Sequence, residues 1–366
     1  RGYADTLTIA AFERARVLVH QVGAIESVSS IFNGLYVFFS NRAETAQALE
    51  IAFEFLAIAE QAEDPLSLMS ASRMVASTYN MMGQFRRARP YCERAMALAS
   101  VEAEARQNTR LIEDPGVEAM RSLAIMFWHA GEVEKALAVE RDLILYAAGI
   151  AHANTLGSVL GLVICTSAFR RRDFETMDIM SQRLIQHGQT YGLEMWEWLG
   201  RAYRGWLLIH QAQPERGIGE LERAMSQFER TQAQAVRLMH LSMLGEGYLA
   251  QGEYGKAQAL FDQALALAER TGANYYTAEL WRLRARTYLM SGGRESRAQG
   301  EAALNLAMAI ARDQGAIMYE MRAACDLWRL QNDAGCGGSA FEHRIDPMAL
   351  ARAADIDRTG LAQIAR

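Results

Sequence analysis

The chain has 366 residues, of which 51% are apolar and 22% charged, with a formal net charge of −5 and a pI near 5.9. This acidic balance argues against a nucleic-acid-binding surface as the main function, and the absence of any run of 18 or more apolar residues argues against a membrane span. With only five prolines and little strand-like alternation, the composition predicts an all-α protein. Its widely spaced cysteines favour a cytoplasmic location.

The first residue is Arg rather than Met, and no charged-then-apolar signal segment follows it. The opening AFERARVLVHQVGA has the pattern of a second repeat helix whose first helix is missing. An uncapped repeat would expose apolar surface there. We therefore expect the chain to be a fragment of something longer, cut near a domain boundary.

From about Ser30 to Gly335, a two-helix unit recurs about every 40 residues. Each first helix carries a large or apolar residue near its end, and these residues are separated by 39 to 41 positions, apart from one step of 48. The alignment positions are Phe39, Tyr79, Phe127, Ala168, Ile209, Tyr248, Tyr288 and Trp328. The pattern predicts about eight units.

The unit LGEGYLAQGEYGKAQALFDQALALAE holds the spacings of a tetratricopeptide-type repeat. Glycine stands just past the first helix, where a left-handed residue costs least, and small residues with one aromatic fill the space between the helices. These spacings are held by Leu244, Gly245, Tyr248, Gly252, Tyr254, Ala257, Phe261 and Ala264. Since such a unit must bury its apolar face on its neighbours, the fold is expected to be a right-handed α-solenoid with a concave groove.

Several segments depart from this pattern. The polar run near 101–117 indicates an inserted loop, and Arg172 and Gln213 occupy turn positions that hold glycine in other units. Pro90, inside a second helix, is expected to kink that helix or to delay its start. We expect one repeat domain over 1–335 and an irregular tail over 336–366, with a short capping helix from Pro347 to about Ala354.

No segment predicts catalysis, a cofactor or a metal. The glycine-rich GCGGS at 335–339 lacks the lysine and the preceding strand of a phosphate loop, and the seven histidines show no metal-ligand spacing. Four widely spaced cysteines indicate buried free thiols in a reducing compartment. The expectation is therefore a non-enzymatic chain.

The groove is expected to be lined by the residue six positions before each alignment position. These residues are Asn33, Arg73, Arg121, Leu162, Tyr203, Ser242, Arg282 and Arg322, and the flanking residues are Asn80, Trp128, His129, Arg286, Asp326 and Arg329. Four of the eight are arginines, whose planar fork suits carboxylate or phosphate, so they could clamp an acidic peptide or a small anionic ligand. Alternatively, each could pair with an acid three residues earlier, such as Glu118 or Glu279.

Three tryptophans, Trp196, Trp198 and Trp206, lie close together in MWEWLGRAYRGW. Aromatic residues at helical spacing are more often core than contact, so two of the three are expected to be packed.

Beyond the repeats, the chain resembles the C-terminal helical region of large bacterial signalling ATPases. The likeness runs over about Gly2 to Leu330, in GLYVFFSNRAETAQALEIAFEFLAIA, EDPGVEAMRSLAIMFWHAGEVEKAL, EMWEWLGRAYRGWLLI and YYTAELWRLRARTYLMSGG. Its most specific parts are DPGV at 114–117 and AELWR at 278–282; the tail from Cys336 does not match. In that family an adenylate/guanylate cyclase or DNA-binding domain and an ATPase precede this region.

The resemblance implies a sensor or scaffold arm that binds a partner or small ligand in its groove and acts on the nucleotide switch. The ATPase domain of its own chain is one such partner. The residues of the ATPase and cyclase are absent here, so no catalytic residue carries over. The alternative is a free-standing adaptor for peptide tails or subunits, and a third reading is an enzyme whose site lies in the groove. Membrane and direct nucleic-acid binding are not expected.

Overall fold

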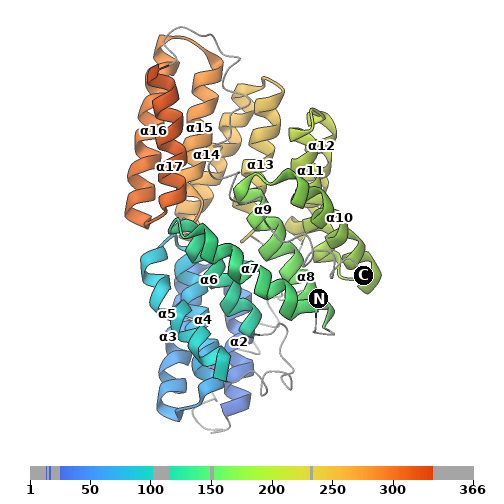
Figure 1. Ribbon diagram of the computed structural model, residues 1–366, viewed down its shortest axis with the longest axis vertical. Helices are drawn as coiled ribbons and strands as arrows, with labels where there is room; N and C mark the ends of the chain where they lie inside the picture. Colours follow the sequence, from blue (N-terminus) through green and yellow to red (C-terminus); the bar gives the residue numbers. More distant parts are fainter. Residues whose placement is uncertain are drawn as a thin grey trace.

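The structure, a computed structural model, describes residues 25–101, 115–148, 152–230 and 234–332, together with 14, 16 and 17. In these residues the expected helix pairs are present, and no strand occurs. Seven pairs and the first helix of an eighth unit follow one another along the described chain (Figure 1). The all-α solenoid predicted from the repeats is confirmed.

The first helices of the units are α2 (Ile25–Asn41), α4 (Pro65–Met81), α6 (Pro115–His129), the composite α8 (Ala153–Ser158), η2 (Val159–Cys165) and α9 (Thr166–Arg171), α11 (Glu194–His210), α13 (Arg237–Ala250), α15 (Thr277–Ser291) and α17 (Ile317–Asn332). The second helices are α3 (Thr45–Ala62), α5 (Phe85–Val101), α7 (Val133–Ala148), α10 (Phe174–Tyr191), α12 (Pro214–Arg230), α14 (Tyr254–Thr271) and α16 (Arg294–Gln314). Element η2 is a π-helix.

Residues with positive φ mark the turn inside each unit. They recur every 40 or 41 residues apart from one step of 48, at Ala43, Gly83, Gly131, Arg172, Ala212, Gly252 and Gly292. Arg172 therefore takes the glycine position, as expected. In the fifth unit the left-handed residue is Ala212, not Gln213, so the alignment of that unit on Ile209 is wrong by one residue, and Leu208 is its true equivalent.

Two other expectations concern single segments. Helix α5 begins at Phe85 and continues through Pro90, so the expected delay of its start is wrong. The opening to residue 24, most of the loop near 101–117 and the tail over 336–366 with its capping helix lie outside the described ranges, apart from residues 14, 16 and 17. Those expectations stay predictions.

Small residues let the two helices of a unit approach closely, as the repeat predicted. A Cβ on Gly245 would lie 2.4 Å from Phe261 Cε1, so the aromatic of α14 rests against bare backbone of α13. Phe261, Ala257 and Ala264 are fully buried. Of the three clustered tryptophans, Trp196 and Trp206 are buried and Trp198 is partly buried under Arg201, which confirms that two are packed.

The superhelix winds far enough for the loops before α13 and α15 to reach the first two units. Figure 1 shows α14–α17 standing end to end on α2–α6 along the long axis. The amides of Gln234 and Ala235 donate to the carbonyl of Asn41, at 2.8 and 3.1 Å, and the amide of Tyr275 donates to the carbonyl of Met81, at 3.1 Å. We call these contacts between the turns of the first units and the loops of the last units the seam.

Candidate binding surface

The first helices pack against one another along the chain, α2 on α4, α4 on α6, α11 on α13, α13 on α15 and α15 on α17. They therefore line the inside of the curve, as expected for this repeat. We call this the inner face. Its polar residues form two groups, a charge network near the C-terminal end and a small pocket on α6, α7, η2 and α9.

The charge network centres on Glu279, which is completely buried in α15. Its carboxylate accepts hydrogen bonds from Arg282 Nε and Nη2, at 2.8 and 2.7 Å, and from Arg322 Nη1, at 3.3 Å. Arg282 Nη1 also donates to Asp326, at 2.7 Å, and Arg329 reaches the other oxygen of that carboxylate, at 3.2 Å. The guanidinium of Arg282 is thus fully engaged within the protein.

Burial alone would raise the pKa of Glu279, but the charges of Arg282 and Arg322 outweigh burial and lower that pKa to about 2. Glu279 is therefore ionised at neutral pH. A buried carboxylate can remain charged only because these guanidinium groups surround it.

A second carboxylate, Glu246 in α13, extends the network. Arg172 Nη1 lies 2.5 Å from one oxygen, Trp206 Nε1 donates to the other at 3.2 Å, and His210 Nε2 lies 3.4 Å away. Arg172 can reach this carboxylate from the turn after α9, where its φ is 60°. Burial opposes ionisation of Glu246, but Arg172 and His210 hold its pKa well below the usual range.

Arginines outnumber carboxylates in this network. Five guanidinium groups face three carboxylates, the arginines being Arg172, Arg282, Arg286, Arg322 and Arg329 and the acids Glu246, Glu279 and Asp326. Arg286 forms no ion pair with any described residue, and burial together with the charge of Arg282 lowers its pKa. This network therefore carries an excess of positive charge.

The pocket lies where α6, α7, η2 and α9 meet. It is lined by Arg121, Ala124, Ile125, Trp128, Glu140, Leu162, Val163, Ser167 and Arg170. Arg121 and Leu162 are two of the residues expected in the groove, and Trp128 was expected at its edge. The pocket lining thus combines apolar side chains with two arginines, Arg121 and Arg170, and one carboxylate, Glu140.

Part of the pocket wall is the π-helix. The carbonyl of Gly161 accepts hydrogen bonds from Thr166 Oγ1, at 3.1 Å, and from Tyr203 Oη, at 3.2 Å. These two hydroxyls supply hydrogen bonds to a backbone carbonyl in the widened turn of the π-helix. Short π segments within α-helices often accompany functional sites.

The sequence-predicted residues fall into two sets. Arg73 Nη2 donates a hydrogen bond to Asn33 Oδ1, at 3.0 Å, and Arg73 also forms an ion pair with Glu118. The same Glu118 carboxylate forms an ion pair with Arg121, at 3.4 Å. The network unites Arg282, Arg286 and Arg322. The pairing with an acid three residues earlier is thus present for both Arg121 and Arg282.

The remaining predicted residues do not join these groups. Asn80 donates to the carbonyl of Ser122, at 3.1 Å, and is 5% exposed. Tyr203 is buried in the core, where its hydroxyl meets Thr166 and Gly161, and the corrected register places Ala202 at the groove-equivalent position. Ser242 is also fully buried.

Sequence reasoning missed Arg170, Arg172 and Glu246 as inner-face residues. An arginine at a position that elsewhere holds glycine was the available signal for Arg172. Glu246 carried no signal of its own, because an acid within a first helix is equally compatible with a solvated face.

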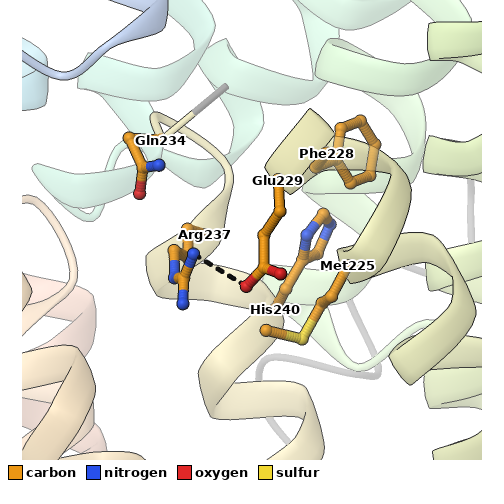
Figure 2. A pocket seen from close by; sticks show the side chains of 6 residues that line it. All are labelled: Met225, Phe228, Glu229, Gln234, Arg237 and His240. Carbon is orange, nitrogen blue, oxygen red and sulfur yellow. Dashed lines mark ion pairs between the residues drawn. The ribbon is translucent and has the colours of Figure 1, made fainter. Parts of the chain in front are cut away.

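A second small pocket lies between α12 and α13. It is lined by Met225, Phe228, Glu229, Gln234, Arg237 and His240 (Figure 2). Arg237 and Glu229 form an ion pair at 3.0 Å across it. The ring of His240 lies 5.0 Å from that of Phe228 and is tilted against it by 30°. Burial lowers the pKa of His240 to about 4, so it is neutral at physiological pH.

Three further findings concern the described residues as a set. Cys92 and Cys165 are buried free thiols, and Cys325 is partly buried. Burial raises the pKa of Cys92 to about 12. No group of acidic, histidine or cysteine side chains in the described ranges could hold a metal ion. In the same ranges, no helix is both long enough and apolar enough to span a bilayer.

In a comparison with known families, residues 241–275 match a tetratricopeptide repeat model. The chain is also 24% identical over 277 residues to an uncharacterised protein of Rhizobium meliloti (strain 1021), a match that covers 74% of this chain and 26% of that protein. The chain therefore spans about a quarter of the length of this relative.

Among solved structures, the chain is similar to the APC/C hetero-tetramer Cut9-Hcn1, at 13% identity and a TM-score of 0.38, over 85% of this chain and 58% of that one. It is also similar to a Rap protein in complex with competence and sporulation factor, at 14% identity and a TM-score of 0.34, over 88% of this chain and 85% of that one. The helix-pair architecture and the family match together show a tetratricopeptide-like repeat region.

Proposed function

We propose that this superhelix is the regulatory arm of a larger signalling ATPase or cyclase, and that its inner face receives an acidic segment of a partner protein or of its own chain. The observation that carries the proposal is the excess of arginine on the inner face, where five guanidinium groups face three carboxylates. Guanidinium groups bind carboxylates with charge-assisted hydrogen bonds.

Two further observations support the proposal that the superhelix is a regulatory arm of a larger protein. The Rhizobium relative continues well beyond the matching region, since only 26% of it is covered. The AELWR motif, which carries the resemblance to signalling ATPases, supplies Glu279 and Arg282, the centre of the charge network. A partner could act on the nucleotide switch only if it bound the two states of the switch with different affinity.

ATP hydrolysis by the full gene product tests this proposal. We expect the rate to change when residues 25–332 are deleted, because the arm would bias the switch. An ATPase domain whose rate is the same with and without the arm would contradict the regulatory role.

The second candidate is a free-standing adaptor that binds peptide tails or subunits, and it is favoured by the tetratricopeptide match alone. A gene product without an ATPase or cyclase domain would support the adaptor. The third candidate is a small anionic ligand bound by the same arginines, and titration with free dicarboxylic acids distinguishes it from a peptide.

A further inference from the structure

The seam repeats in register along the superhelix, because each late unit rests on the unit five places before it. The loop before α13 in unit six meets the turn of unit one at Asn41, and the loop before α15 in unit seven meets the turn of unit two at Met81. Unit eight continues the series, since a Cβ on Gly131 in the turn of unit three would lie 3.2 Å from Ile317 Cγ2 at the start of α17. Units six to eight therefore lie on units one to three (Figure 1).

Across the inner face, helix α17 packs directly on α6. The ring of Tyr319 on α17 lies 5.3 Å from that of Trp128 and 5.2 Å from that of His129, both on α6. Arg322, one turn further along α17, donates a hydrogen bond to the carbonyl of Arg170 at the end of α9. Opposite walls of the groove are thus in contact, and the pocket left beside α6 has a volume of about 10 Å³, which is room for about one water molecule.

Three polar atoms are buried without a hydrogen bond where α17 meets α6. They are Trp128 Nε1, His129 Nε2 and Tyr319 Oη, and none has a partner among the described residues. Burial and the charge of Arg170 hold the pKa of His129 well below its ordinary value, so its ring is neutral. Its Nδ1 donates to the carbonyl of Ile125, at 2.7 Å, which leaves Nε2 as an acceptor. Because water can satisfy these three atoms once the helices part, their burial weakens the closed arrangement at its own contact.

The units on either side of the seam keep separate apolar cores. One cluster of buried side chains lies in α2, α3 and α4 and includes Phe32 and Phe55. Another lies in α15, α16 and α17 and includes Leu304. Separation of the seam would leave both clusters packed. The seam can therefore part while the helix pairs on each side stay folded, as rigid-body switching requires.

We propose that α17 and the seam form a clasp that closes the superhelix over its own inner face, and that a partner reaches this face only after units six to eight separate from units one to three. This inference rests on the proposed function and deepens it, because it names how access to the inner face is regulated. A ligand that binds only the open form would shift the molecule toward that form. Its apparent affinity would be reduced by the fraction of molecules that is open.

Solvent exchange of the Trp128 indole proton measures the opening of the clasp. NMR of the chain with ¹⁵N-labelled tryptophan follows this proton, and Trp128→Phe identifies its signal among the six tryptophans. Tyr319→Ala should accelerate the exchange about tenfold or more, because the contact of α17 with Trp128 is lost. Tyr319→Phe should slow it about fivefold, because it removes a buried hydroxyl that has no partner among the described residues. The control is Tyr288→Ala on α15, whose hydroxyl contacts Gln258 away from the seam, and its exchange should match that of the wild type.

A disulfide across the seam tests whether the clasp opens as one element. A Cβ on Gly272 at the end of α14 would lie 3.9 Å from Thr45 Cβ at the start of α3, the spacing that a disulfide needs. In the double variant Thr45→Cys/Gly272→Cys, oxidation should slow exchange of the Trp128 indole about tenfold relative to the reduced form. The bridge joins units one and six whereas the indole lies in unit three, so the effect requires concerted opening. The φ of 72° at Gly272 disfavours cysteine, but the reduced and oxidised forms share that effect.

The acidic peptide acetyl-Leu-Glu-Leu-Glu-amide separates this inference from the proposed function. We expect the peptide to bind the reduced double variant and to bind the oxidised form about tenfold more weakly or less. Equal affinity for the two forms would refute the clasp, and so would indole exchange that neither Tyr319→Ala nor the disulfide changes. If the peptide binds neither form while the disulfide still slows exchange, the clasp stands and the proposed function fails.

Discussion

Glu279 connects most of the inner charge network, since Arg282 and Arg322 both donate to it and Arg172 lies 4.0 Å away. Removing one member of a buried ion pair leaves its partners charged and uncompensated, which costs about 3–5 kcal/mol. We therefore expect Glu279→Gln to lower the free energy of unfolding by about 3 kcal/mol in urea denaturation. Glu269→Gln on the exposed surface of α14 is the control and should change it by less than about 0.5 kcal/mol.

His240 makes stability depend on pH, because its pKa is about 4 in the folded protein and about 6.5 when it is exposed. A lowered folded pKa gives stability that is present above pH 6.5 and lost as pH falls toward 4. We expect wild type to lose roughly 3 kcal/mol over this window that His240→Phe does not lose. Parallel stability curves for the two proteins between pH 6.5 and 4 would contradict this.

At the residue scale, the ion pairs within one helix could be predicted from the sequence, whereas the contacts between distant units could not. Arg282 and its acid three residues earlier could be paired from helical spacing alone, and so could Arg121 and Glu118. The contacts of Arg172 with Glu246 and of Trp128 with Arg322 join units far apart in the chain. No local spacing predicts such contacts, because they depend on how the whole superhelix curves.

At the element scale, alanine substitutions of two glycines in α12 should change the free energy of unfolding in opposite directions. A Cβ on Gly217 would lie 2.4 Å from the carbonyl oxygen of Gly205, whereas a Cβ on Gly219 would have nothing within 4 Å. Backbone cannot yield as a flexible side chain does, so Gly217→Ala should lower the free energy of unfolding by about 1–3 kcal/mol. Gly219→Ala should raise it by about 0.5–1 kcal/mol, because alanine is the better helix former.

Thermal unfolding of the two alanine variants provides the measurement. Similar shifts in both variants would show that α11 and α12 are not in backbone contact at this point. The comparison is controlled internally, since the two substitutions are identical and lie two residues apart on one helix.

Most helices could be predicted from the sequence repeat, because glycine turns and small packing residues recur at a fixed spacing. The π-helix did not, since the segment VLGLVIC has no feature that distinguishes it from an ordinary buried helix. Its widened turn is accompanied by hydrogen bonds that Thr166 and Tyr203 donate to the carbonyl of Gly161, and Tyr203 comes from the next unit.

At the scale of the whole molecule, the seam can be tested at Gly83. Gly83 and Gly252 occupy the same turn position, with φ of 72° and 75°. A Cβ on Gly83 would lie 2.7 Å from Gln314 Nε2 and 3.0 Å from the carbonyl oxygen of Asn274, whereas one on Gly252 would meet nothing within 4 Å. Both alanine variants should lose about 1–2 kcal/mol to the left-handed backbone, and Gly83→Ala should lose more.

Hydrogen exchange separates the two effects. Only Gly83→Ala should accelerate exchange of the Tyr275 amide, which donates to the Met81 carbonyl across the seam. Equal exchange in both variants would indicate that the seam does not close. The seam itself was not predictable from the sequence, because it joins residues about 190 positions apart and contains no shared motif.

The central claim is that the arginine-rich inner face receives an acidic segment. Its most direct test is cross-linking of an acidic peptide that carries a photoreactive group, followed by mass spectrometry to locate the attachment. We expect attachment on the inner helices α6, η2, α9 and α17, with Arg170→Ala reducing the yield. Attachment confined to the second helices, or the same yield from a peptide in which Gln replaces Glu, would contradict the account.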